Sequence, residues 1–439
     1  MAMRIEQVLG RQVYDSRGRP TIEAEVRLEG GAAGRAIAPA GASKGKAEAV
    51  DRRDGDAAFG GYGVAAALAG LGERIAPRIR GLDASDQAAL DAALIALDGT
   101  PNRAGLGANA MIAVSMAAAH AVAAGRGLPL WRHLLGDHAG AVALPLPEIQ
   151  IFGGGAHAAG RIDIQDFMVV CPGASSVAEA LAWTAEIYRA AGEIMAERGG
   201  LAGVADEGGW WPVFDGNEAA LDALVQAIER AGRRPGEEVS ISLDVAASEF
   251  GRDGRYRLGA DKADLDTDGL FERLADWMAR YPIVSIEDPF GEDDAQGFLR
   301  FTRTFGQRVQ VVGDDFLVTD AARVRAAGQS GTANAVLLKP NQRGTLTETL
   351  EAWEAAEAYG MGGIVSARSG ETEDTTICDL AVGWQVPQLK VGSFSRSERM
   401  AKWNALLRIE EALGDRARFV GRQPYVSLPP APSSGSMSA

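Results

Sequence analysis

Short apolar runs alternate with longer segments of helical period over the second two thirds of the chain. Four of these runs, each ending abruptly in a charged residue, lie at 239–244, 283–287, 309–314 and 335–339. Short apolar runs that are bounded in this way are typical of buried strands. Their spacing suits one strand and one helix per step of roughly 30 residues.

Segments of helical period fill the gaps between the apolar runs. We predict helices over 177–198, 217–232, 267–280, 295–306, 319–328, 346–360, 371–383 and 396–413. Strands that alternate with helices favour an α/β barrel, and a doubly wound open sheet is the alternative.

The first part of the chain has a different pattern. Segments 4–9 and 21–28 alternate with period two around a turn at 15–20, and 62–134 is helical in period. This predicts paired strands followed by helices. We therefore predict three parts, an N-terminal α+β capping domain over 1–138, a catalytic α/β barrel over 139–425 and a disordered tail over 426–439.

Composition excludes several classes of function. Lys and Arg number 44 against 59 Asp and Glu, and a net charge of −15 argues against nucleic acid or an anionic membrane as partner. No apolar run reaches the roughly 20 residues that span a bilayer. Two cysteines, Cys171 and Cys378, are too few for a disulfide framework, so we expect a cytoplasmic protein.

Three of the apolar runs end in carboxylates, Asp244, Glu287 and Asp314. In a barrel the carboxyl ends of the strands meet on the catalytic face. Three carboxylates gathered there repel one another, and a bound cation removes that repulsion. Oxygen ligands select a hard ion, so we predict Mg²⁺ rather than three separate helix caps.

Two lysines follow strand-like runs beside these carboxylates. Lys339 ends the most apolar run and is a candidate base for a weakly acidic carbon-bound proton, although a lysine with a buried apolar stem is the simpler interpretation of one such residue. Lys390 ends another short run at 388–390 and is a candidate partner for a substrate carboxylate.

Three loops carry further candidates. Arg368 and Ser369 follow a strand and precede a predicted helix N-terminus, where free N–H groups would favour an oxyanion or a phosphate. Glu207, in Asp206-Glu-Gly-Gly, is a candidate general acid, and an ordinary surface turn is the alternative. The small-residue loop at 36–45 resembles a mobile lid whose Ser43 reaches a metal or phosphate, and His157 lies in a glycine-rich loop.

These motifs together resemble those of the enolase (phosphopyruvate hydratase) family over about residues 4–425. The strings that carry the resemblance are Asp15-Ser-Arg-Gly, Gly41-Ala-Ser, Asp206-Glu-Gly-Gly, Leu243-Asp-Val-Ala-Ala-Ser-Glu-Phe, Ser285-Ile-Glu-Asp-Pro-Phe, Val312-Gly-Asp-Asp, Leu338-Lys, Arg368-Ser-Gly-Glu-Thr-Glu-Asp and Arg396-Ser-Glu-Arg. The resemblance implies an enolase-type barrel with an N-terminal lid domain, two Mg²⁺ ions, a small phosphorylated substrate and a homodimer or homo-octamer.

The resemblance also implies a role for each candidate residue. Asp244, Glu287 and Asp314 would hold one Mg²⁺, and Ser43 would help to hold the second. Lys339 would be the base, and Lys390 would stabilise the enolate. Arg368 and Ser369 would hold the phosphate, Glu207 would assist departure of the hydroxyl, and His157 would face the substrate.

The departures from the family pattern gather on one side of the implied site. Ala367 stands where enolases have histidine, Lys44 stands in the lid where they have threonine, and the substrate-side Asp166 replaces a glutamate. Trp210 and Trp211 add bulk after the Glu-Gly-Gly string. Lys44 is placed to meet an extra anionic group on a substrate.

Three hypotheses for function remain open at this point. The first is dehydration of 2-phosphoglycerate or a close analogue. The second is a specialised relative in phosphonate or secondary metabolism, such as a carboxyphosphonoenolpyruvate synthase. The third is an enolase-like binding protein without catalysis, against which the retained Lys339, Lys390 and Glu207 argue.

Overall fold

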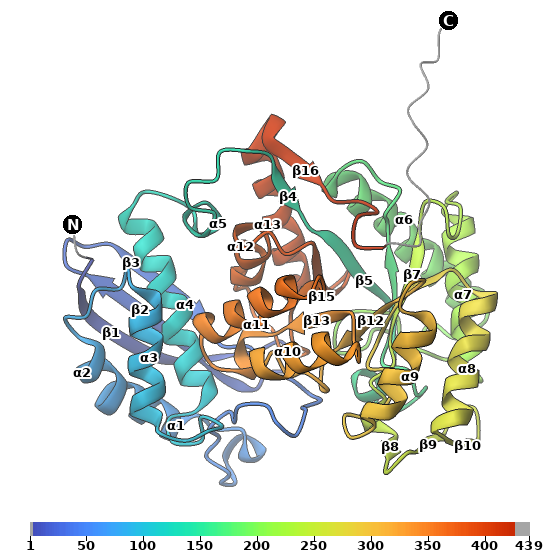
Figure 1. Cartoon of the computed structure of the whole chain (residues 1–439), viewed down its shortest axis with the longest axis horizontal. Coiled ribbons are helices and arrows are strands. Elements are labelled where there is room, and N and C mark those ends of the chain that lie inside the picture. The colour runs from blue at the N-terminus through green and yellow to red at the C-terminus, as the bar shows by residue number, and fades with distance from the viewer. Residues whose placement is uncertain (1–2, 426–439) are drawn as a thin grey trace, which may run out of the picture.

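The computed structural model describes residues 3–425, which form a sheet-and-helix domain beside a closed barrel (Figure 1). The N-terminal domain, blue to cyan in Figure 1, lies at one side of the barrel. The predicted tail over 426–439 lies outside the described residues.

An antiparallel sheet and a buried helix make the core of the N-terminal domain. The sheet has the order β1 (Ile5–Tyr14), β2 (Pro20–Leu28) and β3 (Ala33–Ile37), and the helices are α1 (Ala65–Gly70), α2 (Ala76–Ile79), α3 (Gln87–Asp98), α4 (Ala108–Gly125) and α5 (Leu130–Leu134). Helix α4 contacts β2 and β3. Gly34 permits this contact, because a Cβ there would lie 2.1 Å from the Ala121 nitrogen.

Helix α4 is also the one helix of the described chain that is long and apolar enough to cross a membrane. Its residues are 83% buried inside the protein. The apolar composition of α4 is therefore explained by its place in the core of the N-terminal domain.

Eight strands close the barrel in the order β11-β12-β13-β14-β15-β5-β6-β7. Their bounds are β5 (Leu146–Gly153), β6 (Asp166–Val170), β7 (Ser240–Asp244), β11 (Ile283–Glu287), β12 (Gln310–Gly313), β13 (Ala335–Leu338), β14 (Gly362–Ser366) and β15 (Gln388–Ser393). The predicted barrel is confirmed, and the open sheet is wrong.

Strand β6 departs from a barrel of parallel strands. It pairs antiparallel with both β5 and β7, because the 154–165 connection is a hairpin loop without a crossover helix. Asp166, at the beginning of β6, is therefore paired with Asp244, at the end of β7. A residue that starts a strand thus faces the same mouth as residues that end strands.

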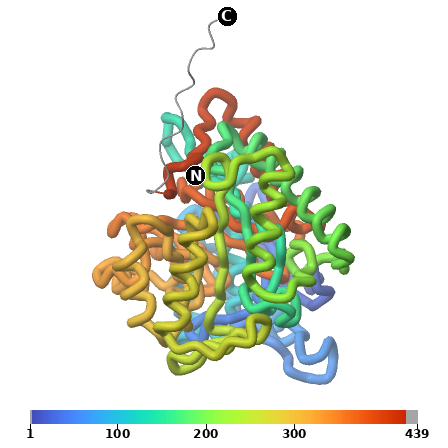
Figure 2. Tube along the Cα trace, turned by 90° about the vertical axis from the view of Figure 1, so that its right-hand side faces the viewer, coloured from blue at the N-terminus to red at the C-terminus, as the bar shows by residue number. Residues whose placement is uncertain are grey.

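Helices cover the outside of the barrel (Figures 1 and 2). They are α6 (Val177–Glu197), α7 (Asn217–Arg230), α8 (Thr267–Arg280), α9 (Ala295–Phe305), α10 (Ala321–Ser330), α11 (Leu346–Ala358), α12 (Thr376–Gly383) and α13 (Ser397–Leu413). Several begin at a side chain that accepts a backbone N–H of the first turn, namely Ser176, Asp266, Asp294, Asp320 and Thr345.

Seven of the eight predicted barrel helices agree with the structure to within a few residues. The helix predicted from residue 371 was wrong at its start, because α12 begins at Thr376. Residues 371–375 instead form a turn in which the Glu371 carboxylate accepts the Arg368 N–H at 3.0 Å and Asp374 accepts the Thr376 N–H at 2.8 Å.

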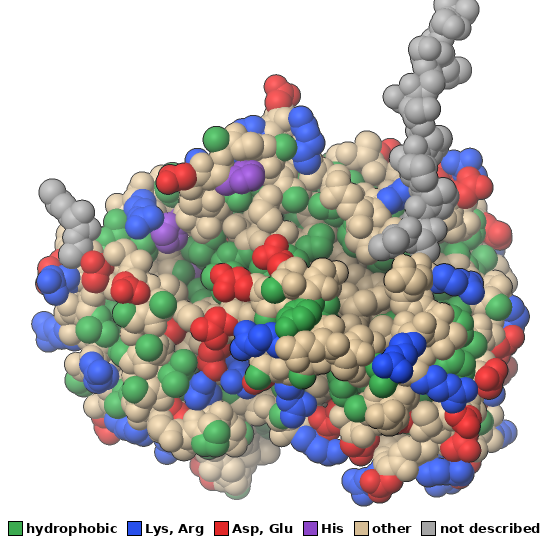
Figure 3. Space-filling model, viewed as in Figure 1, with side chains coloured by type: hydrophobic (Ala, Val, Ile, Leu, Met, Phe, Trp, Pro, Cys, Tyr) green, Lys and Arg blue, Asp and Glu red, His purple; other side chains and the backbone are tan. Residues whose placement is uncertain are grey.

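Short strands complete the described fold. They are the parallel pair β4 (Val142–Leu144) and β16 (Ala417–Phe419), and the small sheet β8 (Gly251–Arg252), β9 (Arg255–Leu258) and β10 (Ala263–Asp266). On the face shown in Figure 3, acidic and basic side chains are interspersed, so the net negative charge is not gathered into one patch there.

The barrel interior is apolar on one side and polar on the other. Val312, Ala335, Leu337 and Ile364 form an apolar cluster on β12, β13 and β14. The polar side holds Glu148, whose carboxylate accepts hydrogen bonds from Gln388, from Ser242 at 3.4 Å and from the Tyr425 hydroxyl at 3.5 Å. Burial raises the pKa of Glu148 to about 7.

Candidate active site

A small cavity opens at the mouth of the barrel, between the strand ends and the N-terminal domain. The sequence-predicted residues that line it are Ser43, His157, Asp166, Glu207, Asp244, Lys339, Arg368, Ser369 and Lys390. Glu287 and Asp314 lie buried behind them and contact the two lysines. The topology therefore gathers residues that are more than 300 positions apart in the sequence.

The ammonium of Lys390 lies between two of the predicted metal ligands. Its Nζ donates to Asp244 Oδ2 at 2.8 Å and to Glu287 Oε2 at 2.7 Å, and Asp166 Oδ2 is 3.5 Å away. Burial and the charge of Asp244 raise the pKa of Glu287 well above its ordinary value. Burial opposes the charge of Lys390, but the surrounding carboxylates raise its pKa.

Lys390 does not end its strand as predicted. Strand β15 continues to Ser393 through an irregularity between Lys390 and Gly392, where Gly392 has a φ of +106°. The glycine is required there because other residues rarely adopt this conformation.

Lys339 and Asp314 form the second lysine–carboxylate pair. The Lys339 ammonium donates to Asp314 Oδ2, and the Gln342 amide donates to Asp314 Oδ1 at 2.9 Å. Burial alone would raise the pKa of Asp314, but Lys339 lowers it below its ordinary value. In the same way the charge of Asp314 outweighs burial and raises the pKa of Lys339.

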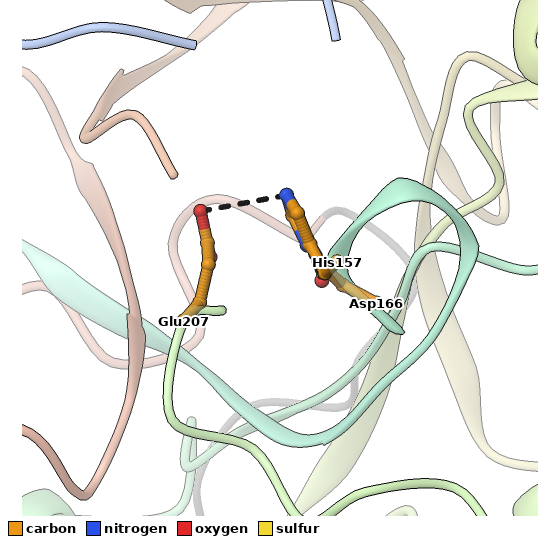
Figure 4. Close-up of side chains that lie close together, drawn as sticks. All are labelled: His157, Asp166 and Glu207. Carbon is orange, nitrogen blue, oxygen red and sulfur yellow. Dashed lines mark hydrogen bonds and ion pairs between the residues drawn. The ribbon is translucent and has the colours of Figure 1, made fainter. Parts of the chain in front are cut away.

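His157, Asp166 and Glu207 form a buried group at the edge of the cavity (Figure 4). His157 Nδ1 lies 2.9 Å from Asp166 Oδ1, and His157 Nε2 lies 3.7 Å from Glu207 Oε1. Burial lowers the pKa of His157, but the charges of the two carboxylates outweigh burial and raise the pKa to about 9. The imidazole is therefore a cation at neutral pH.

The loops that carry His157 and Glu207 are bound to each other and to β5. The Asp206 N–H donates to the His157 carbonyl at 3.1 Å, and the Trp210 N–H donates to the Ile151 carbonyl at 2.8 Å. The Trp210 ring stacks on Tyr188 of α6 at 4.8 Å and does not line the cavity. The bulk added at this position therefore supports the loop rather than filling the site.

Arg368 and Ser369 are held by the loop at 38–49 of the N-terminal domain, which follows β3 and which we call the lid. The Ser369 hydroxyl accepts the Ala42 N–H at 2.7 Å, and Arg368 Nη2 donates to the Ser43 carbonyl at 3.0 Å. The predicted helix N-terminus beside them is wrong, because α12 begins at Thr376 and the Gly370 N–H donates to the Ala40 carbonyl. Arg368 and Ser369 therefore line the cavity without a helix N-terminus beside them, so their side chains are the groups that could bind an anion.

Lys44 does not line the cavity. Its Nζ lies 3.3 Å from Asp51 Oδ2, and its side chain is 45% exposed. In this lid position Lys44 is not placed to meet a substrate anion.

The acidic groups at the mouth could hold a cation, although in this structure the described ligand atoms of Asp244, Glu287 and Asp314 are not all within 4.8 Å of one another. Among the described residues, the buried oxygens Glu287 Oε1 and Asp166 Oδ2 have no hydrogen-bond donor. Asp244, Glu287 and Asp314 end adjacent strands, where lysine ammonium groups now compensate their charge. Asp314 also lies with Asp288 and Asp315 in a group whose ligand atoms are within 4.8 Å of one another. Oxygen donors of this kind suit Mg²⁺.

Several residues that position the site were missed from the sequence. Gln165 donates to Asp244 Oδ2 at 3.0 Å, and both carboxylate oxygens of Asp288 accept the backbone N–H groups of residues 314 and 315. Glu48 accepts from Arg368 at 3.0 Å. Asp288 follows Glu287 directly, which was a usable signal, whereas nothing in the sequence pairs Glu48 with a residue 320 positions away.

Family comparison covers the same two regions that the fold separates. The enolase N-terminal domain matches residues 5–134, and the enolase C-terminal TIM barrel domain matches residues 141–427. The two matches cover nearly the whole chain and account for both the N-terminal domain and the closed barrel. The chain therefore belongs to the enolase family.

Proposed function

We propose that this protein is a Mg²⁺-dependent carbon–oxygen lyase of enolase type. It would remove the C2 proton of 2-phosphoglycerate, or of a close phosphorylated 2-hydroxy acid, and eliminate the β-hydroxyl to give phosphoenolpyruvate or an analogue. The observation that carries this proposal is the pairing of two buried lysines with carboxylates from three adjacent strand ends at one cavity.

Lys339 is the group that would accept the C2 proton. It lines the cavity and is buried, but it is protonated as long as it donates to Asp314. It acts as a base only when Asp314 has another positive partner. Magnesium on the carboxylates would supply that positive charge and would offset the negative charge that develops on the substrate.

Lys390 and Arg368 would bind the two ends of an anionic substrate. Lys390 offers an ammonium at the level of Asp244 and Glu287, which suits a substrate carboxylate. Arg368 and Ser369 lie under the lid, where a guanidinium and a hydroxyl suit a phosphate. The lid contacts on both residues would shield a bound substrate from water.

His157 and Glu207 would act on the leaving hydroxyl. The imidazolium lies 3.7 Å from Glu207 Oε1, and both line the cavity. A proton delivered from this pair to the hydroxyl oxygen would let it depart as water. We further propose a cytoplasmic protein and a homodimer or homo-octamer, as in the family that the chain belongs to.

The direct test is turnover of 2-phosphoglycerate with Mg²⁺, followed by the ultraviolet absorbance of the enol product. Sustained turnover that stops when the metal is chelated supports the proposal. If neither turnover nor exchange of the C2 proton with deuterated water occurs while Mg²⁺ binds, the protein is a binding protein without catalysis.

One observation favours a specialised relative as a second candidate. Ala367 lines the cavity next to Arg368 with a side chain smaller than the histidine of the family pattern, and this change would let the wall accommodate a substituent beyond those of 2-phosphoglycerate. A phosphonylated 2-hydroxy acid in a carboxyphosphonoenolpyruvate synthase reaction is a substrate of this kind. Rapid exchange of the C2 proton with poor turnover of 2-phosphoglycerate would favour this candidate over the first.

A further inference from the structure

The guanidinium of Arg368 has already committed most of its N–H groups within the protein. Nη1 donates to Glu48 Oε2 at 3.0 Å and to Asn341 Oδ1 at 3.1 Å. Nη2 donates to Glu48 Oε1 at 3.2 Å and to the Ser43 carbonyl at 3.0 Å. Arginine has five N–H donors. The described residues therefore leave one of them, on Nε, without a protein acceptor.

Glu48 is held as firmly as the arginine that it binds. Its side chain is 5% exposed, and Oε1 also accepts the Gly45 N–H and the Gln342 amide, each at 3.2 Å. A fork-to-fork pair between guanidinium and carboxylate fixes the plane of both groups. Because Glu48 lies on the lid and Arg368 follows β14, the pair also joins the two domains.

Glu48 keeps Arg368 apart from the carboxylates of the proposed metal site. The charges of Asp314 and Asp51 also act on the Arg368 guanidinium. The Gln342 amide bridges Glu48 and Asp314, which places the two carboxylates on either side of one side chain. Without Glu48, Arg368 would be drawn toward Asp314, because a buried guanidinium needs a counter-charge.

The lid backbone packs directly on the guanidinium. A Cβ at Gly41 would lie 1.9 Å from Arg368 Nη2, so the position accepts only glycine while Arg368 keeps this place. The orientation of Arg368 is thus set by Glu48, by Asn341 and by the lid backbone before any ligand is present.

We propose that Glu48 is a positioning residue for anion binding, which holds Arg368 beside the cavity and away from Asp314. A phosphate-type anion then meets an oriented guanidinium that does not have to be released from another site residue. Glu48 itself does not touch the anion. This role rests on the proposed function, because it assumes a phosphorylated substrate in the cavity.

The test is titration of the full chain with inorganic phosphate in the presence of Mg²⁺, by calorimetry. Loss of binding in Arg368→Ala establishes that phosphate binds at this site. We expect Glu48→Ala to weaken phosphate binding by about 10- to 100-fold, as for loss of a charge-assisted contact and of pre-organisation. Glu48→Gln keeps the size of the side chain but removes the counter-charge, so it should also weaken phosphate binding, by about 10-fold, and unchanged affinity in this variant would overturn the role.

Glu23→Ala is the matched control, since Glu23 is a buried carboxylate of the N-terminal domain that pairs with Arg11 and Arg35 and not with Arg368. It should keep the parent affinity. In turnover of 2-phosphoglycerate, Glu48→Ala should raise KM together with the dissociation constant for phosphate, because Arg368 is no longer held beside the cavity. A merely structural role would lower Tm without raising KM or weakening phosphate binding.

The outcomes separate this role from the proposed function. Unchanged phosphate affinity in Glu48→Ala overturns the positioning role, and so does tighter binding in Glu48→Gln, which would make Glu48 a competitor for Arg368. If Glu48→Ala does not fold, Glu48→Gln alone decides. Failure of the parent protein to bind phosphate while it still turns over 2-phosphoglycerate overturns this role alone, whereas failure of both overturns the proposed function as well.

Discussion

The two ends of the barrel interior deal with buried charge in opposite ways. At the mouth, Asp244, Glu287 and Asp314 are each paired with a lysine ammonium. Deeper in the barrel, Glu148 accepts hydrogen bonds only from the neutral groups of Gln388, Ser242 and Tyr425, although the charge of Lys390 also acts on it. Burial raises the pKa of both Glu287 and Glu148, so the two ends differ in the partner that holds the carboxylate and not in the direction of this shift.

This difference indicates at which end of the barrel a carboxylate can exchange a lysine ammonium for a metal ion. A carboxylate held by an ammonium can pass to a metal, because one positive partner replaces another. A carboxylate held by neutral amide and hydroxyl groups answers instead to pH. Chemistry that needs a cation and a movable proton therefore belongs at the mouth.

The largest effect is expected from removal of one partner at the mouth. Lys339→Ala should lower exchange of the C2 proton of 2-phosphoglycerate by about 10²- to 10⁴-fold, the usual contribution of a general base. Mg²⁺ should still bind at least as tightly, because the carboxylates remain and Asp314 loses a competing ammonium. Proton NMR in deuterated water measures the exchange and calorimetry the metal.

Lys46→Ala is the control for this substitution, since Lys46 is 77% exposed and pairs with Glu292. It should leave exchange unchanged. Exchange at the parent rate in Lys339→Ala would contradict the base assignment.

Removal of the other mouth lysine should test the exchange of partners directly. Lys390→Met leaves Asp244 and Glu287 buried without their ammonium, and in chelator the free energy of unfolding should fall by about 3–5 kcal/mol. Excess Mg²⁺ should restore most of this loss, because it supplies the missing charge. Urea unfolding with and without Mg²⁺ measures both values. Equal losses in the two conditions would show that the lysine and the metal do not share these carboxylates.

Glu148→Gln should change the pH dependence of the free energy of unfolding, which distinguishes Glu148 from the carboxylates at the mouth. The pKa of Glu148 in the folded protein is about 7, raised from an ordinary 4.5, so its stabilising contribution is full below pH 4.5 and is lost as the pH rises to 7. Relative to the parent, the variant should gain up to about 3 kcal/mol in free energy of unfolding between pH 5 and pH 8.

Urea unfolding of both proteins at the two pH values measures this change. Glu6→Gln at an exposed position is the control and should show no such pH dependence. A difference between parent and Glu148→Gln that stays constant with pH would contradict the raised pKa.

The smallest effect is expected from the hydroxyl below Glu148. Tyr425→Phe removes the contact of the Tyr425 hydroxyl with Glu148 and its hydrogen bond from Gln388 at 3.1 Å. We expect a loss of about 1 kcal/mol in free energy of unfolding, typical of one buried hydrogen bond. Mg²⁺ affinity should not change. A tenfold change in that affinity would show that the two ends are coupled.

Prediction from the sequence succeeded where the signal was local. Apolar runs that end in charge located β7, β11, β12 and β13 together with Asp244, Glu287, Asp314 and Lys339. The period of the helices placed seven of eight helices, because caps such as Ser176 and Thr345 follow local rules.

Prediction from the sequence failed where the answer depends on the three-dimensional pairing. The antiparallel direction of β6 follows from a hairpin whose twelve-residue length also fits a crossover, so the place of Asp166 beside Asp244 could not be predicted. The pairing of Lys44 with Asp51, and of Glu48 with Arg368, depends on how the lid rests on the barrel. The burial of Glu148 inside the barrel could not be predicted, because in the sequence it is one polar residue among others near a strand.

The reversed strand has a consequence for how this protein diverges from its relatives. The 154–165 hairpin joins β5 to β6, the 198–216 connection joins the outer helices α6 and α7, and the two loops contact each other at His157 and Asp206. Insertions and deletions in these two tips alter the substrate side without shifting the register of any barrel strand. Changes in these loops can therefore alter substrate preference while the positions of Lys339 and Lys390 at the barrel strands stay the same.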